Sequence, residues 1–165
     1  DILRNEDISV SLIIIGNNNG YLKKILKKLD NLNLRDQVTI LTGLTNLELY
    51  CVYMLSNAFI FPSTYEGFGI PILETMSVGK PYTLSNLPVF KEITQNQGNY
   101  FNPNDPNDIA SSIKEILSNK EEQERLKKYS ETRVKDFVFL HLAQQLQTIY
   151  LSSVEKFGFK NTNES

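Results

Sequence analysis

Short apolar runs alternate with helix-like segments along this chain, and that alternation limits the fold more than any other feature. The run SVSLIIIG at 9–16 is rich in β-branched residues and ends in glycine, which is typical of a strand buried on both faces. The segment 21–32 then places apolar residues at helical spacing, with lysines on the opposite face. We therefore expect an α/β, Rossmann-like three-layer domain with a parallel sheet and helices on both faces.

The same alternation continues to the C-terminus. Further strands are expected at 37–43, 58–62, 81–85 and 99–101. Further helices are expected at 46–57, from about Pro71 to Ser77, at 105–118 and across 119–157. We expect one domain over 1–157, a polar tail over 158–165, and ligand binding at the carboxyl ends of the strands.

Typical capping residues mark the ends of these helices. Thr45 or Asn46 is the expected N-cap of the helix 46–57, and Asp105 that of the helix 105–118. Gly79 suits the position just after the helix that ends near Ser77. Within 46–57, the helical spacing of Tyr50, Tyr53 and Met54 predicts core packing rather than a ligand site.

The composition excludes several function classes. The 165 residues carry 17 basic and 19 acidic side chains, and this formal charge of −2 argues against nucleic acid as the main partner. The single cysteine, Cys51, allows no internal disulfide. The single histidine, His141, leaves little for a histidine-rich metal site. No apolar run approaches the roughly 20 residues that a membrane-spanning helix needs.

The stretch TYEGFGIPILE at 64–74 combines a flexible corner with two carboxylates, and it follows an expected buried strand. Gly67 and Gly69 let the backbone turn and let a ligand approach without a Cβ atom in the way. The backbone amides of Gly67, Phe68, Gly69 and Ile70 open the next helix, where amides lack intrahelical partners and favour phosphate or sugar oxygens.

The carboxylates of Glu66 and Glu74 need a different partner, because a carboxylate repels a diphosphate. Vicinal hydroxyls of a ribose or hexose donate hydrogen bonds that one carboxylate can accept in parallel. We therefore expect Glu74 to reach a ribose and Glu66 to face a sugar. Taken singly, each glutamate has a plainer explanation, since loop glutamates are usually solvated and glutamates in a first turn complement the helix dipole.

Together, the spacing Glu66-x7-Glu74 and the enclosed GFGIP resemble the donor-binding C-terminal half of a GT-B glycosyltransferase of the retaining family four. Flanking segments agree in order from about residue 9 to 150, among them LIIIGNNNGYLKKILKKL, SVGKPYTLSNLPVFKEI and GNYFNPNDPNDIASSI. The resemblance implies a fragment that binds a nucleotide-diphosphate sugar. The longer enzyme would transfer the sugar, a hexose, with retention of configuration, in bacterial surface polysaccharide or lipopolysaccharide synthesis.

The resemblance also implies roles for single residues. Glu74 matches the glutamate that binds the ribose hydroxyls, and Glu66 the one near the reacting centre, where it would orient the sugar and stabilise positive charge. Phe68, Gly69 and Ile70 match positions whose amides touch the sugar and diphosphate, and Gly43 and Leu44 match the wall of the base pocket. The family uses no metal and no cofactor, because the nucleotide sugar is itself the substrate.

The chain departs from the family pattern in what is missing. The first strand–helix unit of this half, with its diphosphate-binding Arg and Lys, and the N-terminal acceptor domain are not in the sequence. Arg4 lies in the wrong context, and Lys23 and Lys24 fit a solvated helix face. We therefore expect the fragment to be inactive alone. The partners implied are the donor and a saccharide or lipid-linked acceptor, in the cytoplasm or at the inner face of its membrane through peripheral association.

Two other functions fit the same residues. One is a non-catalytic module that binds a nucleotide sugar, and the other is a GT-B nucleotide-sugar epimerase. The intact Glu66-x7-Glu74 spacing with its glycines favours transfer over epimerisation. The presence of an acceptor groove in the longer protein would separate an enzyme from a binding module.

Overall fold

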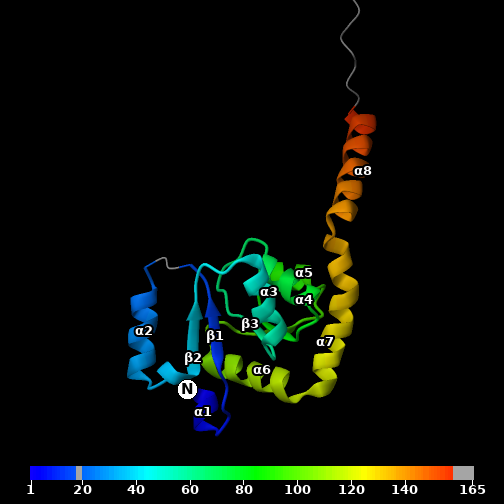
Figure 1. The fold of residues 1–165 in the computed structure, drawn as a ribbon. Coiled ribbons are helices and arrows are strands. Elements are labelled where there is room, and N and C mark those ends of the chain that lie inside the picture. The colour runs from blue at the N-terminus through cyan, green and yellow to red at the C-terminus, as the bar shows by residue number, and fades with distance from the viewer. Residues whose placement is uncertain (18–19, 158–165) are drawn as a thin grey trace, which may run out of the picture.

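The structure, a computed structural model, describes residues 1–17 and 20–157. Its strands form two parallel sheets (Figure 1). In the first sheet β1 (Leu12–Ile15) pairs with β2 (Val38–Leu41). In the second sheet β4 (Tyr82–Ser85) lies between β3 (Phe59–Phe61) and β5 (Asn99–Phe101). The α/β class and the parallel pairing are confirmed, but the described strands form two sheets where one sheet was expected.

Helices connect the strands in the expected alternation. Their bounds are α1 Ile2–Asn5, α2 Leu22–Asn31, α3 Asn46–Leu55, α4 Ile70–Ser77, α5 Pro88–Ile93, α6 Pro106–Ser118, α7 Lys120–Arg133 and α8 Phe139–Phe157. Short 3-10 turns, η1 and η2, cover Arg35–Gln37 and Val134–Phe137. The helical region expected at 119–157 is therefore divided at η2, and α5 was not expected from the sequence.

The predicted helix ends are confirmed by their hydrogen bonds. Thr45, not Asn46, is the N-cap of α3, and it forms a capping box with Glu48. The Asp105 carboxylate accepts a hydrogen bond from the Asn107 amide at the start of α6. Gly79 follows α4 at a positive φ of 64°, and its amide donates to the Met76 carbonyl, which closes the last turn.

The core lies around the three-stranded sheet. Tyr82 and Leu84 on β4 are fully buried, because β4 is the central strand and helices pack against it. The other fully buried large side chains come from α4, α5, β5, α6 and α7, and they are Ile72, Met76, Phe90, Phe101, Ile116 and Leu126. This core fixes α4, and with it the glycine corner that precedes α4.

The two-stranded sheet is much less buried than its sequence predicts. We expected a strand at 9–16 buried on both faces, but Leu12 and Ile13 are each 42% exposed and Ile15 is 38% exposed. Among the described residues β1 has a strand neighbour on one edge only, namely β2. Its apolar side chains therefore lack the neighbours that the sequence pattern presupposes, and the prediction of full burial is wrong for the described chain.

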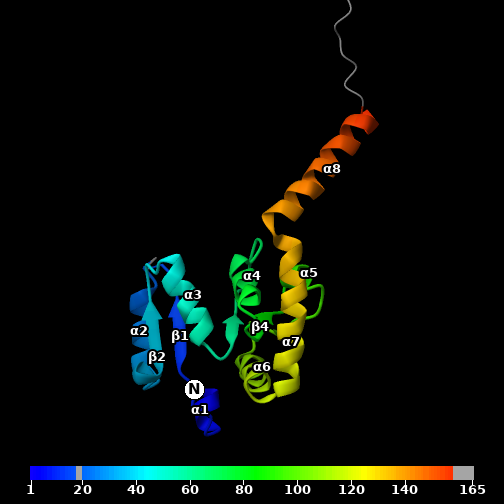
Figure 2. The same ribbon diagram turned by 45° about the vertical axis from the view of Figure 1, so that its right-hand side comes forward.

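Helix α8 projects away from the body of the molecule (Figure 2). Leu146, Ile149 and Tyr150 on it are exposed. Within the described part of the chain, no helix has the length and apolarity required to cross a membrane. The polar tail predicted at 158–165 lies outside the described residues, as do Asn18 and Asn19 of the loop after β1.

Candidate functional site

The glycine corner lies between the end of β3 at Phe61 and the start of α4 at Ile70. Gly69 is the N-cap of α4 and has a φ of 93°, in the left-handed region that side chains rarely adopt. A Cβ atom on Gly69 would lie 3.0 Å from the Phe90 ring and 3.2 Å from Ile72. The corner therefore depends on glycine both for its backbone angle and for its packing against the core.

Glu66 folds back onto the corner. Its Oε1 accepts hydrogen bonds from the amides of Gly67, at 3.0 Å, and of Phe68, at 3.5 Å. We expected these two amides to be open to a ligand, and in this structure the Glu66 carboxylate holds them instead. The amides of the corner therefore donate hydrogen bonds to an anionic oxygen here, as amides at a helix N-terminus do to a phosphate oxygen.

Glu74 lies one turn into α4 and is half-buried. Its Oε2 accepts a hydrogen bond from the hydroxyl of Tyr53 at 3.0 Å. Tyr53 belongs to α3 and is buried, as the sequence predicted, whereas Tyr50 and Met54 are exposed. Burial first, and then the charge of the Glu74 carboxylate, raise the pKa of Tyr53 well above its usual value, so that this hydroxyl remains a proton donor.

The remaining corner residues differ in exposure. Gly69 is buried, while the side chains of Phe68 and Ile70 are 46% and 62% exposed. The Phe68 ring meets the ring of Phe137 from η2 edge-on, with centroids 6.1 Å apart. This contact joins the corner to the segment that connects α7 and α8.

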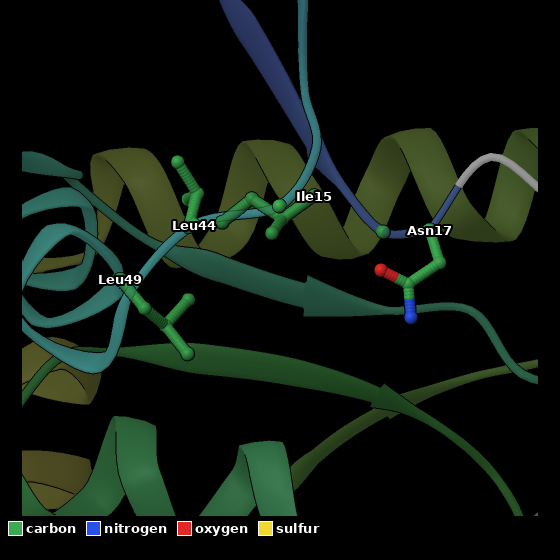
Figure 3. Close-up of a pocket in the computed structure, with 6 residues that line it drawn as sticks. Ile15, Asn17, Leu44 and Leu49 are labelled. Atoms are coloured by element: carbon green, nitrogen blue, oxygen red, sulfur yellow. The ribbon is translucent and has the colours of Figure 1, made fainter.

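Gly43 and Leu44, the predicted base-pocket residues, line a hollow of about 150 Å³. Ile15, Gly16, Asn17 and Leu49 complete its wall. Figure 3 shows Leu44 beside Ile15, with Leu49 reaching in from α3 and the Asn17 side chain on the side of β1. Both β1 and β2 end at this hollow, so it lies at the carboxyl ends of parallel strands, where α/β folds bind ligands.

Helix α3 links the hollow to the glutamate corner. Leu49 lines the hollow, and Tyr53, four residues later, donates to Glu74. Residues four apart on a helix share a face and are about 6 Å apart along its axis. One face of α3 thus contacts both parts of the site: Leu49 lines the hollow with Gly43 and Leu44, and Tyr53 binds Glu74. Glu66 instead binds the corner's own backbone.

Sequence reasoning missed part of this arrangement. Ile15, Gly16 and Asn17 could have been found, because they follow a predicted strand at its carboxyl end. The role of Tyr53 had no sequence signal beyond its helical spacing, since its contact with Glu74 joins residues 21 positions apart.

Two of the cations considered from the sequence have contacts outside the candidate site. The Arg4 guanidinium donates to the carbonyls of Leu32, at 3.0 Å, and Asn33, at 3.1 Å, and so binds the end of α2. Lys24 lies over the ring of Tyr21. Among the described residues, no group of three or more His, Cys, Asp or Glu side chains is arranged to hold a metal ion.

Comparison with known proteins identifies relatives of this chain. O-antigen chain mannosyltransferase RfbU of Salmonella typhimurium is 37% identical over 108 residues, covering 66% of this chain and 31% of that protein. Serotype-specific mannosyltransferase WbdA of Escherichia coli is 32% identical over 123 residues, covering 74% of this chain and 15% of that protein. This chain therefore spans less than a third of either relative.

Solved structures establish the fold. A glycosyltransferase from Rickettsia africae superposes with a TM-score of 0.80 at 17% identity, covering 96% of this chain and 43% of that one. The C-terminal domain of a glycosyl transferase group 1 family protein from Francisella tularensis superposes with a TM-score of 0.66 at 18% identity, covering 81% of this chain and 71% of that one. The family model described as glycosyl transferases group 1 matches residues 1–133, and the chain therefore belongs to that family.

Proposed function

We propose that this chain binds the donor of a glycosyl transfer, a nucleotide-diphosphate sugar, and that the protein to which it belongs transfers a hexose with retention of configuration. The observation that carries the proposal is the corner around Gly69, which precedes α4, has amides that donate to a carboxylate oxygen, and has a glutamate on either side. One relative is described as an O-antigen chain mannosyltransferase and another as a serotype-specific mannosyltransferase. Mannose is therefore the first sugar to test, in surface polysaccharide synthesis.

The proposed donor lies along α3. The base occupies the hollow at Gly43 and Leu44, and the ribose hydroxyls bind the Glu74 carboxylate near the next turn of that helix. The diphosphate and the sugar then meet the amides of Gly67, Phe68, Gly69 and Ile70. This order suits a ligand with hydroxyl groups at both ends and phosphates in the middle.

Binding requires the Glu66 carboxylate to leave the amides of Gly67 and Phe68. Oxygens of the diphosphate or sugar take its place, because these amides donate hydrogen bonds to anionic oxygens. The released carboxylate then accepts hydrogen bonds from hydroxyls of the sugar and stabilises the positive charge that develops at the anomeric carbon. The proposed transfer needs no metal, and the departing diphosphate takes the proton of the acceptor.

The proposed activity belongs to a longer protein in which residues 1–157 form the donor-binding domain. That protein supplies an N-terminal acceptor domain for a saccharide or lipid-linked acceptor, and a preceding strand–helix unit with cations for the diphosphate. The proposal of a preceding strand is supported by the open edge of β1 and by the exposed apolar side chains on β1. We propose that the enzyme works in the cytoplasm, with peripheral association to the membrane where the acceptor is lipid-linked, and that residues 1–165 alone transfer no sugar.

The test is calorimetric titration of the full-length protein with UDP-, GDP- and ADP-sugars, together with a turnover assay. Glu74→Ala is expected to weaken nucleotide binding about tenfold or more, because it removes charge-assisted hydrogen bonds to the ribose. Glu66→Ala is expected to bind nucleotide nearly normally and to lose most turnover. Glu124→Ala, an exposed glutamate on α7, is the control and should change neither.

The outcomes separate the candidate functions. Unchanged affinity in Glu74→Ala would remove the ribose assignment, and unchanged turnover in Glu66→Ala would remove that residue from the reacting centre. Donor binding by the full-length protein without any transfer would favour a binding module, and inversion of the sugar without an acceptor would favour an epimerase.

A further inference from the structure

Tyr53 is the one described side chain that donates a hydrogen bond to the Glu74 carboxylate. The two residues come from different helices, α3 and α4, so their contact is a tertiary one. Tyr53 is 6% exposed, and its ring packs against Phe59 of β3 with centroids 5.7 Å apart. Packing therefore holds the ring in place, and its hydroxyl lies beside α4 within hydrogen-bond distance of Glu74.

The chemistry of the contact restricts Glu74 to one arrangement. A glutamate without contacts samples several rotamers, and binding a ligand through one of them costs conformational entropy. The Tyr53 hydroxyl donates to Oε2 at 3.0 Å, and no described residue donates to Oε1 or forms an ion pair with Glu74. Since a carboxylate has about four acceptor positions, this contact leaves room for two further hydroxyl groups.

In this contact Tyr53 is the donor and Glu74 is the acceptor. Burial, together with the nearby Glu74 charge, raises the pKa of Tyr53, so the phenol stays protonated at neutral pH. The protonated hydroxyl can therefore donate its hydrogen bond to the Glu74 carboxylate and orient it. The other tyrosine on this helix, Tyr50, is 51% exposed and offers no such contact.

We propose that Tyr53 is the positioning residue for Glu74, and that it holds the carboxylate in the orientation that receives the two vicinal hydroxyls of the donor ribose. The proposal rests on the donor-binding function argued above and adds to it a residue that acts through Glu74 and touches no ligand. Leu49, one turn earlier on the same face of α3, lines the hollow proposed for the base. One face of α3 thus contributes Leu49 to the hollow proposed for the base and Tyr53 to the position of Glu74, the proposed ribose-binding residue.

The test uses Tyr53→Phe in the full-length protein, because phenylalanine keeps the ring packing against Phe59 and removes only the hydroxyl. The probe is whichever of UDP, GDP and ADP binds most tightly, compared with its 2′,3′-dideoxy analogue, by calorimetry. Tyr53→Phe should weaken binding of the ribonucleotide about three- to tenfold, the effect of one lost hydrogen bond. Its affinity for the dideoxy analogue should equal that of the wild type, and Tyr50→Phe should match the wild type for both ligands.

A double-mutant cycle separates positioning from general packing. In the Glu74→Ala background, Tyr53→Phe should have no further effect, because the group on which it acts is gone. Equal losses for both nucleotides, or an undiminished loss in the Glu74→Ala background, would show a merely structural role and overturn the proposal. So would wild-type affinity of Tyr53→Phe for the ribonucleotide.

The two proposals fail in different ways. If Glu74→Ala weakens ribonucleotide binding and Tyr53→Phe does not, the donor function stands and the role of Tyr53 falls. If the wild type binds none of the nucleotides, or Glu74→Ala binds them as the wild type does, the ribose assignment falls and takes the role of Tyr53 with it. Thermal unfolding of both tyrosine variants checks that each remains folded under the titration conditions.

Discussion

Gly69 and Phe90 lie so close that a Cβ atom on the glycine would be 3.0 Å from Cε1 of the phenylalanine. Phe90 is fully buried in the core of the three-stranded sheet. The corner that precedes α4 therefore packs against the buried core. The backbone at Gly69, with a φ of 93°, packs against Phe90. The amide of Gly67 donates to the Glu66 carboxylate.

We predict that Gly69→Ala lowers the free energy of unfolding by about 2 kcal/mol, from left-handed backbone strain and the tight contact with Phe90. Urea denaturation measures the change. Gly67→Ala is the matched control, because its added Cβ would meet nothing within 4 Å and Gly67 is not among the residues of positive φ. Equal stability of the two variants would show that the Phe90 contact does not constrain the corner.

The capping box of α3 makes the stability of that helix depend on pH. The Thr45 hydroxyl and amide both donate to Glu48 Oε2, at 2.7 and 2.8 Å, and they lower the pKa of Glu48 below its ordinary 4.5. A carboxyl whose folded-state pKa is lowered stabilises the fold above its unfolded-state pKa, and that contribution is lost as the pH falls through the folded-state value.

We therefore predict that unfolding of the wild type becomes easier as the pH is lowered through about 4.5 and below. Glu48→Gln should show a shallower fall over the same range, because its side chain does not titrate. Urea midpoints from pH 6 to pH 3 measure the slope, and Glu124→Gln on α7 is the control. Parallel curves for wild type and Glu48→Gln would contradict the prediction.

The strands and most helices could be predicted because apolar alternation and cap residues are local signals. The helix α5 was missed, since it has only six residues and begins at Pro88 in a segment that reads as a loop. The burial of β1 was overestimated because an apolar run shows what a strand prefers to contact and not which neighbours are present. Leu12 is apolar whether or not a strand lies beside it.

The candidate site was predictable to the extent that it is local. The turn at Gly69 and the start of α4 follow from neighbouring residues, and the structure confirms both. The return of Glu66 onto the Gly67 amide depends on a side-chain rotamer that no sequence pattern records. The contact of Tyr53 with Glu74 depends on how α3 crosses α4, which is decided by core packing.

The contact of Phe68 with Phe137 predicts a link between the corner and η2. The Phe137 ring also lies 4.5 Å from the Arg133 guanidinium, whose Nε donates to the Ile93 carbonyl at 2.7 Å. Phe137→Leu should therefore cost about 1 kcal/mol of stability and loosen the corner. Hydrogen exchange at the amides of Gly67 and Phe68 should accelerate. Val138→Ala, at the exposed neighbouring position, should leave that exchange unchanged.

The open edge of β1 gives a prediction about the longer protein proposed above. The Gly16 amide donates to the Leu41 carbonyl of β2, and amides of alternate residues on a strand point to the same edge. The amides of Ile13 and Ile15 therefore point to the opposite edge, where no strand of the described residues lies. If a preceding strand pairs there, these two amides gain partners that the 165-residue chain does not provide.

Hydrogen exchange followed by NMR on both proteins measures this. In the 165-residue chain, Ile13 and Ile15 should exchange much faster than Ile14 and Gly16, whose amides face β2. In the full-length protein all four should be protected, because both edges of β1 are then paired. Ile14 and Gly16 serve as internal controls within the same strand. Rapid exchange of Ile13 and Ile15 in the full-length protein would mean that β1 stays at the edge of its sheet, and that no strand joins it to β3.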